Sequence, residues 1–427
     1  MNRASGCVGV GHSPAQPEGK QRTRLYNPPS ATHNQCLAII GKVNAPILDR
    51  QPSAGSPTWA EISLDALRHN FRAVKGLVGD EVSICAVVKA DAYGHGSPAC
   101  AQALQAEGAP WFGVTGTEEA MDLRRAGITA RLLLMTGYWK GEEDEVVANS
   151  LTPVVWEPWH VERLDKAAQK RQIVLPVHLK IDTGMTRLGA SKEALPAVCE
   201  SLAASQHLHL EGVSTHFASV RDPEKTRRQA ALFEEGLAVL GANGLYPTLV
   251  HMANSAATLA RAETWKTMVR PGIALYGYSR SPSPDTTQGG ATVPLLRPVL
   301  SWKTRIIAVK NVAAGQAIGY GGTFVTQQLS RIAVLPVGYA DGFHRLLSNR
   351  GRVIVRGEYA PVAGRVSMDL TTIDVTGIAG VDIGDEVILI GRTNGKNVDA
   401  REHARICETI PYEITCSISK RVPRVYT

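Results

Sequence analysis

The sequence lacks long apolar runs and paired cysteines. Its apolar runs, such as the one in CLAIIG at 36–41, are far shorter than the roughly 20 residues that a membrane helix needs. No small-residue cleavage site follows that run, as one would in a secretory signal. The 7 cysteines are scattered along the chain without Cys-x-x-Cys spacing, which argues against a disulfide framework and against a zinc site. We expect a protein of the reducing cytoplasm, with no membrane anchor and no metal.

The sequence also lacks a strong charge on its main part. The whole chain of 427 residues has a net charge of +7, of which +4 belongs to residues 1–57 and only +3 to the rest. Binding to nucleic acid requires Lys and Arg clustered on a folded face. We therefore expect no nucleic-acid partner.

Residues 1–57 contain one aromatic residue, Tyr26, and seven prolines, and they show no sustained periodicity. Such a segment buries too little apolar surface to offset its conformational entropy. We interpret it as a disordered leader, or as the result of a start codon assigned too far upstream. Folded structure should begin near Thr58 with a short strand, followed by an amphipathic helix with Asp65 at its N-cap.

Eight short apolar or β-branched runs alternate with helix-forming segments between 83 and 277. Their ranges are 83–90, 111–116, 131–137, 151–156, 174–184, 210–217, 248–255 and 268–277. This rhythm predicts an α/β fold, a (β/α)8 TIM barrel over 58–290, with an open doubly wound sheet as the alternative.

The pattern changes after Tyr276. A Ser/Pro/Gly-rich loop is followed by alternating runs such as VLSWKTRIIAVKNV and DEVILIGR, separated by glycine-containing turns. Residues 291–427 are therefore predicted to form an antiparallel β domain, which the strand within 58–66 is a candidate to join. One helix, at about 399–409, is expected within it.

Polar residues fall where the predicted barrel strands end, which is where barrels carry their functional groups. They include Lys89, Lys180, His216, His251 and Arg270. A lysine buried as a charge is costly, so either an ion pair or a function must explain Lys89. Because several polar residues converge on one rim, we interpret Lys89 as a Schiff-base lysine, for which pyridoxal phosphate is the commonest aldehyde.

The segments after the last two predicted strands suit the phosphate of such a cofactor. Asn254 and Ser255 open a helix, and Gly272 and Ile273 follow the eighth strand. Barrels commonly bind phosphate at these positions through backbone amides and hydroxyls. An ordinary helix N-cap is the alternative interpretation of Asn254 and Ser255.

Nine ordered motifs from about Thr58 to the C-terminus resemble those of the alanine racemases, pyridoxal-phosphate enzymes of fold type III. They are AVVKADAYGHG, HLKIDTGMTRLG, STHFA, HMANSAA, VRPGIALYG, AIGYGGTF, LPVGYADG, GRVSMD and IPYEITC. The resemblance implies interconversion of L- and D-alanine, which supplies D-alanine for cell-wall peptidoglycan.

The resemblance assigns catalytic roles to two residues. Lys89 would hold the cofactor and act on the D-alanine face, and Tyr320 would act on the L-alanine face. Removing a proton from one face and returning it to the other requires two such groups. His216 would lie beside the tyrosine and link it to Arg270. Arg270 would face the ring nitrogen of the cofactor and, having donors only, would not protonate it.

The resemblance also implies binding roles. Residues expected near the phosphate are Tyr93, Asn254, Ser255, Gly272, Ile273 and Tyr412. Arg187 would contact the cofactor and the substrate carboxylate, supported by a carbamylated lysine at Lys180. Met368 would offer its backbone amide to that carboxylate, and Tyr339 resembles a residue at the entrance of the site.

Because Tyr320 and Met368 belong to the second predicted domain and Lys89 to the barrel, the resemblance implies a head-to-tail homodimer with composite active sites. Three rival functions remain open. They are a racemase of serine or of broad specificity, a fold-related decarboxylase, and a non-catalytic pyridoxal-phosphate-binding protein. The last would need neither a β domain nor Tyr320.

Overall fold

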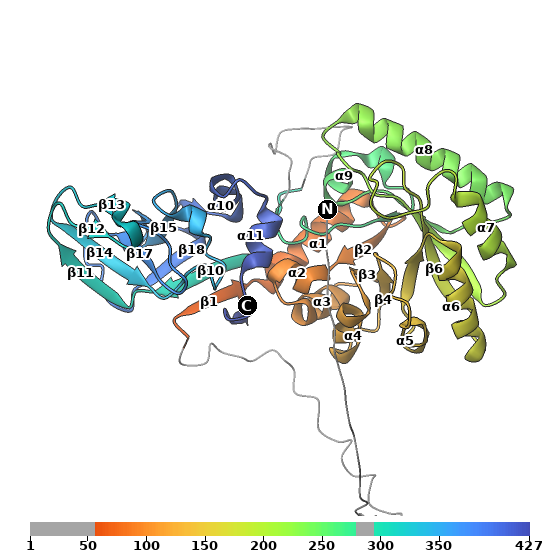
Figure 1. Ribbon diagram of the computed structural model, residues 1–427, viewed down its shortest axis with the longest axis horizontal. Helices are drawn as coiled ribbons and strands as arrows, with labels where there is room; N and C mark the ends of the chain where they lie inside the picture. Colours follow the sequence, from red (N-terminus) through yellow and green to blue (C-terminus); the bar gives the residue numbers. More distant parts are fainter. Residues whose placement is uncertain (1–55, 279–293) are drawn as a thin grey trace, which may run out of the picture. The chain divides into compact units, whose positions relative to one another are not determined.

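The computed structural model describes residues 56–278 and 294–427. Eight parallel strands form a barrel (Figure 1) in the order β8-β7-β6-β5-β4-β3-β2-β9. A bridge between Asn254 and Arg270, just beyond β8 and β9, nearly closes the ring. The predicted barrel is therefore confirmed, and the doubly wound sheet is wrong. The strands are β2 (Ser83–Val87), β3 (Trp111–Val114), β4 (Arg131–Leu134), β5 (Thr152–Val155), β6 (Leu175–Lys180), β7 (Leu208–Ser214), β8 (Leu249–His251) and β9 (Met268–Val269).

Helices surround these strands (Figure 1). They are α1 (Leu64–Val78), α2 (Lys89–Gly94), α3 (Ser97–Ala106), α4 (Thr117–Arg125), α5 (Glu143–Ala148), α6 (Pro158–Lys170), α7 (Leu195–Ala204), α8 (Pro223–Ala242), α9 (Ser255–Ala260) and the 3-10 turn η1 (Ala262–Thr264). The N-cap of α1 is Ser63, whose hydroxyl accepts a hydrogen bond from the Ala66 amide. The prediction of Asp65 at this position is wrong. Asp65 lies in the first turn and pairs with Arg68.

Side chains fill the barrel interior, as expected for a ring of eight strands. One buried cluster takes a single residue from each of five strands, namely Cys85, Trp111, Leu133, Val154 and Met268. Gly113 leaves room for this layer, because a Cβ there would lie 3.0 Å from the Met135 sulfur. The barrel is thus closed beneath any site at its carboxyl end.

The second part of the chain consists mainly of antiparallel sheets. The largest has the order β16-β15-β18-β10-β1-β20, with β19 paired to β18, and it includes β1 (Thr58–Ile62) beside β10 and β20. Its other strands are β10 (Leu300–Arg305), β15 (Arg352–Val355), β16 (Glu358–Pro361), β18 (Glu386–Thr393), β19 (Lys396–Val398) and β20 (Arg424–Tyr426). The smaller sheets contain β11 (Ala308–Val312), β14 (Ser330–Leu335) and β17 (Thr371–Asp374), and the pair β12 (Ala317–Ile318) and β13 (Phe324–Val325).

Short helices complete this part: η2 (Tyr320–Gly322), η3 (Arg345–Leu347), α10 (Ala400–Ile406) and α11 (Pro411–Ser417). The helix predicted near 399–409 is present as α10, but the second helix was not predicted: the chain turns at 407–410 and starts α11 with Pro411 at its first position. The predicted leader, apart from its last two residues, and the predicted boundary near 290 lie outside the described residues.

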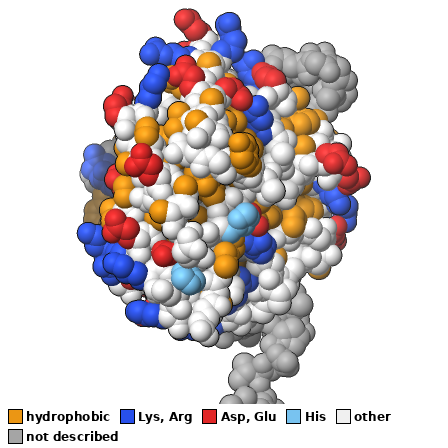
Figure 2. Space-filling view, turned by 90° about the vertical axis from the view of Figure 1, so that its right-hand side faces the viewer, with side chains coloured by type: hydrophobic (Ala, Val, Ile, Leu, Met, Phe, Trp, Pro, Cys, Tyr) orange, Lys and Arg blue, Asp and Glu red, His pale blue; other side chains and the backbone are white. Residues whose placement is uncertain are grey.

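The described surface carries charge of both signs. On the face shown in Figure 2, acidic and basic side chains are interspersed with apolar ones. No helix in the described ranges has the length and hydropathy of a membrane span. Across the same ranges no three His, Cys, Asp or Glu side chains are grouped as metal ligands, and the five cysteines there are free thiols.

Candidate active site

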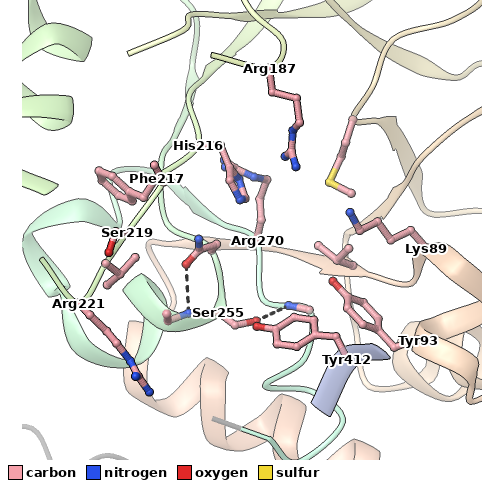
Figure 3. Close-up of a pocket in the computed structure, with 17 residues that line it drawn as sticks. Lys89, Tyr93, Arg187, His216, Phe217, Ser219, Arg221, Ser255, Arg270 and Tyr412 are labelled. Atoms are coloured by element: carbon pink, nitrogen blue, oxygen red, sulfur yellow. Dashed lines mark hydrogen bonds between the residues drawn. The ribbon is translucent and has the colours of Figure 1, made fainter. Parts of the chain in front are cut away.

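A cavity of about 330 Å³ opens at the carboxyl ends of the barrel strands (Figure 3), within the size range of small-molecule sites. Its lining residues come from segments that follow the strands, apart from Val87 in β2 and Tyr412 in α11. The structure brings together nine predicted site residues around this cavity: Lys89, Tyr93, Arg187, His216, Asn254, Ser255, Arg270, Gly272 and Tyr412.

Lys89 was predicted to end a strand, but it begins a left-handed turn instead. β2 ends at Val87, and residues 90–93 all have φ between 51° and 55°. Each L-residue in this conformation costs about 1–2 kcal/mol, so the turn needs external support. Burial, and then the charge of Arg187, lower the pKa of Lys89 below its ordinary value. A larger fraction of its amine is therefore neutral and nucleophilic at physiological pH.

Hydroxyl and amide groups gather on one side of the cavity. The Ser255 hydroxyl accepts hydrogen bonds from the amides of Gly272, at 2.8 Å, and Ala274, at 3.3 Å. Tyr93 packs between Tyr276 and Tyr412. A Cβ on Gly272 would lie 2.2 Å from the Tyr93 hydroxyl oxygen, so only glycine fits there. The hydroxyls of Ser255 and Tyr93 can donate hydrogen bonds to an anion as they stand, and the Gly272 amide can do so once it turns from Ser255.

Arg270 lies at the centre of the site (Figure 3) and is buried. Its guanidinium donates to His251 Nδ1 at 2.7 Å, to the His251 carbonyl at 2.8 Å and to the Thr215 carbonyl at 2.6 Å. It also lies 3.5 Å from Nδ1 of His216. Burial lowers the pKa of Arg270 to about 10, which leaves it charged at neutral pH. The site thus contains a fixed cation.

A series of contacts between side chains leads from Arg270 into the barrel interior. Because arginine only donates, His251 accepts at Nδ1 and carries its proton on Nε2, which lies 2.9 Å from His178 Nδ1. His178 Nε2 is 3.7 Å from Glu211, too long for a hydrogen bond but close enough for attraction. Glu211 forms a two-pronged ion pair with Arg131 at 2.9 and 2.7 Å.

His178 and Glu211 were not among the residues predicted from the sequence. His178 lies two residues before Lys180, so the alternation of side chains along a strand puts both on the same face, and this could have revealed it. A β-bulge could not be read from the sequence: Val177 pairs with Leu210 but His178 with Gly212, which leaves Glu211 as the extra residue. Burial raises the pKa of Glu211, but His178 and Arg131 outweigh that effect and hold it at about 2.

His216 and Lys180 lie close to Arg270. Burial, and then the charge of Arg270, lower the pKa of His216 to about 3, so its imidazole is neutral. The same two causes lower the pKa of Lys180 to about 8. Lys180 lines a smaller cavity of about 60 Å³ together with Lys89, Arg187 and Arg270.

Five residues that the resemblance singled out do not line the main cavity, and one of them, Lys180, lines the smaller one. Ile273 is buried beside Gly272. Tyr320 is 72% exposed, Met368 54% and Tyr339 44%, and all three belong to the second part of the chain. This chain alone does not place them next to Lys89.

Comparison with known proteins agrees with this architecture. The family model described as "Alanine racemase, N-terminal domain" matches residues 62–280, and "Alanine racemase, C-terminal domain" matches residues 299–426. The chain is 45% identical to the alanine racemase of Syntrophobacter fumaroxidans over 365 residues, which cover 85% of this chain and 96% of that protein.

Solved structures are similar over the same region. The alanine racemase of Streptomyces lavendulae is 36% identical with a TM-score of 0.80, covering 87% of this chain and 97% of that one. The enzyme of Bartonella henselae, described with covalently bound pyridoxal phosphate, is 29% identical with a TM-score of 0.76, covering 87% and 100%. The chain therefore belongs to the alanine racemase family.

Proposed function

We propose that this protein interconverts L- and D-alanine with pyridoxal phosphate as its cofactor. The observation that carries the proposal is the meeting of Lys89, Arg187 and Arg270 with a set of hydroxyl and amide donors around one cavity, in a chain of this family. A cation, a nucleophilic amine and an anion-binding rim are the groups that such a cofactor and an amino acid require.

The residues present fit the cofactor. Ser255, Gly272 and Tyr93 offer hydroxyl and amide groups on the side suited to a phosphate, and Ile273 and Tyr412 adjoin them. Asn254 caps α9 by accepting from the amides of Ala256 and Ala257, so its role would be to hold Ser255 in place. Lys89 would hold the cofactor covalently. When bound, pyridoxal phosphate makes the α-hydrogen of an amino acid acidic by drawing electrons from that carbon.

Lys89 is suited to move a proton at one face of the substrate. With its pKa lowered, its Nζ can accept a proton from Cα or return one. Tyr320 would do the same at the opposite face, with neutral His216 beside it and linked in turn to charged Arg270.

Arg270 would hold the ring nitrogen of the cofactor. A guanidinium stays charged at neutral pH and has no acceptor, so Arg270 donates a hydrogen bond without transferring a proton. Its several carbonyl and imidazole contacts fix its orientation before any ligand arrives. This differs from a decarboxylase of the same scaffold, in which a carboxylate is expected at this position.

Arg187 would bind the substrate carboxylate, together with the backbone amide of Met368. A carbamate on Lys180 would turn that cation into an anion able to orient Arg187. The lowered pKa of Lys180, about 8, supports this, because only a neutral amine combines with carbon dioxide. Protein kept in isotope-labelled bicarbonate should show a carbamate NMR signal that Lys180→Ala lacks.

The exposure of Tyr320 and Met368 supports a head-to-tail homodimer. An exposed tyrosine and methionine on the second part of the chain are suited to complete the barrel site of a second copy. We place the enzyme in the cytoplasm, where D-alanine would be supplied for peptidoglycan, and Tyr339 at the entrance of the composite site.

The test is to incubate the cofactor-loaded protein with L-alanine and with L-serine separately, and to follow the chirality of the amino acid. L-alanine should become an equal mixture of enantiomers, because the two have the same free energy, and Lys89→Ala should be inactive. Equal rates on serine would favour a broad-specificity racemase instead. Release of carbon dioxide would favour a decarboxylase. The absence of any reaction would favour a non-catalytic binding protein.

A further inference from the structure

The left-handed turn that follows Lys89 is held at both ends by other segments. At its start, the amide of Ala90 donates to Glu119 at 2.7 Å, and Glu119 also accepts from the Thr115 amide. These contacts come from within the barrel. None of them involves the far end of the turn, at Tyr93 and Gly94.

The far end of the turn is held by Arg424, in the last strand of the chain. Arg424 Nε donates to the Gly94 carbonyl at 3.0 Å. Its other nitrogens donate to carbonyls of Ile418, Ser419 and Val422, each at 2.6 Å. All four acceptors are backbone atoms, so the guanidinium ties the C-terminal tail (418–426) to the turn. A planar group with several donors suits this task, and an ammonium group does not.

The turn and the glycine that follows it also approach α11 and the tail too closely for side chains. A Cβ on Gly94 would lie 2.2 Å from the Thr415 carbonyl oxygen, and a Cβ on Gly96 would lie 1.9 Å from the Tyr426 hydroxyl. Both glycines have φ above 80°. The turn is therefore in direct contact with α11 at Gly94, and the tail is in direct contact with Gly96, two residues further on.

We propose that Arg424 is a positioning residue that, through the Gly94 carbonyl, keeps the turn in the shape that presents Lys89 and Tyr93 to the cavity. Lys89 and Tyr93 lie at the two ends of one strained turn, and Arg424 holds the residue next to Tyr93. Release of this carbonyl frees the turn to relax toward ordinary backbone angles. The inference rests on the proposed function only in that a cofactor binds at Lys89.

The experiment compares Arg424→Met with Arg331→Met. Arg331 is a matched control, because it also donates to a backbone carbonyl, that of Val381 at 2.6 Å, but it lies on β14 and does not contact the turn. Hydrogen exchange of the turn amides is measured first on cofactor-free protein. The relevant amides are those of Ala92, His95 and Gly96, which are bonded within the turn. The dissociation constant of pyridoxal phosphate follows.

Arg424→Met should exchange these amides faster and bind pyridoxal phosphate about tenfold or more weakly, the loss expected for one charge-assisted hydrogen bond. Arg331→Met should change neither. Unchanged exchange and affinity in Arg424→Met would overturn the proposal. Because exchange is measured without cofactor, its result does not depend on whether the protein is a racemase.

Arg424→Lys covers the case in which Arg424→Met does not fold. It keeps the charge and the alkyl stem but cannot reach all four carbonyls together. It should fold and show an intermediate loss of both exchange protection and cofactor affinity. A folded Arg424→Lys protein with wild-type values of both would contradict the proposal.

Discussion

Arg270 carries a buried charge that is met by carbonyl oxygens and an imidazole. Among the described residues the carboxylate linked to it is Glu211, which lies beyond two histidines. A buried cation is expensive unless its hydrogen bonds are satisfied, and this chain of contacts both satisfies and orients it. The barrel interior thus helps to fix the position of the cation at its rim.

Gly212→Ala tests the series of contacts that links Arg270 to Glu211 through the two histidines. A Cβ at Gly212 would lie 2.6 Å from the His178 ring, so the ring must shift, which disturbs its contact with His251. We expect the variant to lose about 1–3 kcal/mol of stability, as for overpacking elsewhere, and to racemise alanine more slowly. Denaturant unfolding and steady-state rates measure the two effects.

Gly76→Ala is the control for that substitution. Gly76 lies in α1 with no neighbour within 4 Å of an added Cβ. This substitution should leave the activity unchanged and stabilise the protein by about 0.5–1 kcal/mol. Equal losses in the two variants would contradict a specific role for the space at Gly212.

The pKa of Lys89 leads to a prediction about pH. Burial and the charge of Arg187 lower this pKa from 10.5, while Glu119 raises it. Because only the neutral amine attaches the cofactor, the attachment rate should rise with pH and reach half its maximum below pH 10.5. Glu119→Gln removes the opposing negative charge, so its midpoint should move to lower pH. Stopped-flow absorbance of cofactor binding gives this profile, and a shift to higher pH would be the wrong sign.

At the scale of elements, the first helix offers a test of its cap. Ser63→Ala removes the hydroxyl that accepts from Ala66 and should cost about 1 kcal/mol of unfolding free energy. Asp65→Ala removes only an exposed ion pair with Arg68 and should cost less than about 0.5 kcal/mol. Thermal unfolding of the two variants ranks them, and the reverse order would favour Asp65 as the cap.

The strands could be predicted because buried parallel strands are almost wholly apolar and are separated by helices of regular length. Features that are set by contacts between distant segments could not be predicted from the sequence. The left-handed turn after Lys89 depends on Glu119 and on Arg424, which is more than 300 residues away in sequence. The bulge at Glu211 depends on the neighbouring strand, and the start of α11 at Pro411 was hidden in a closing segment without clear periodicity.

The site residues divide in the same way. Lys89, His216 and Arg270 were recognisable because each lies where a predicted strand ends, and the barrel brings them to one cavity with Arg187, which was assigned from the resemblance. Tyr320 and Met368 were assigned from the resemblance, and within one chain they are exposed and away from that cavity. Their proposed role therefore depends on how two copies assemble and not on the fold of one chain.

At the scale of the whole molecule, the proposed mechanism requires two copies of the chain. If Lys89 of one barrel works with the partner subunit's Tyr320, a dimer of two Lys89→Ala chains has no intact site, and neither has a dimer of two Tyr320→Phe chains. A hybrid of one Lys89→Ala chain and one Tyr320→Phe chain has one intact site and one doubly altered site.

The measurement is the rate of D-alanine formation from L-alanine after the two inactive variants are unfolded together in equal amounts and refolded. Random pairing makes half of the dimers hybrids, so the mixture should recover about a quarter of the wild-type activity. Each variant refolded alone is the control. A mixture that stays as inactive as its components would contradict the shared site, and a wild-type protein that makes no D-alanine would contradict the account as a whole.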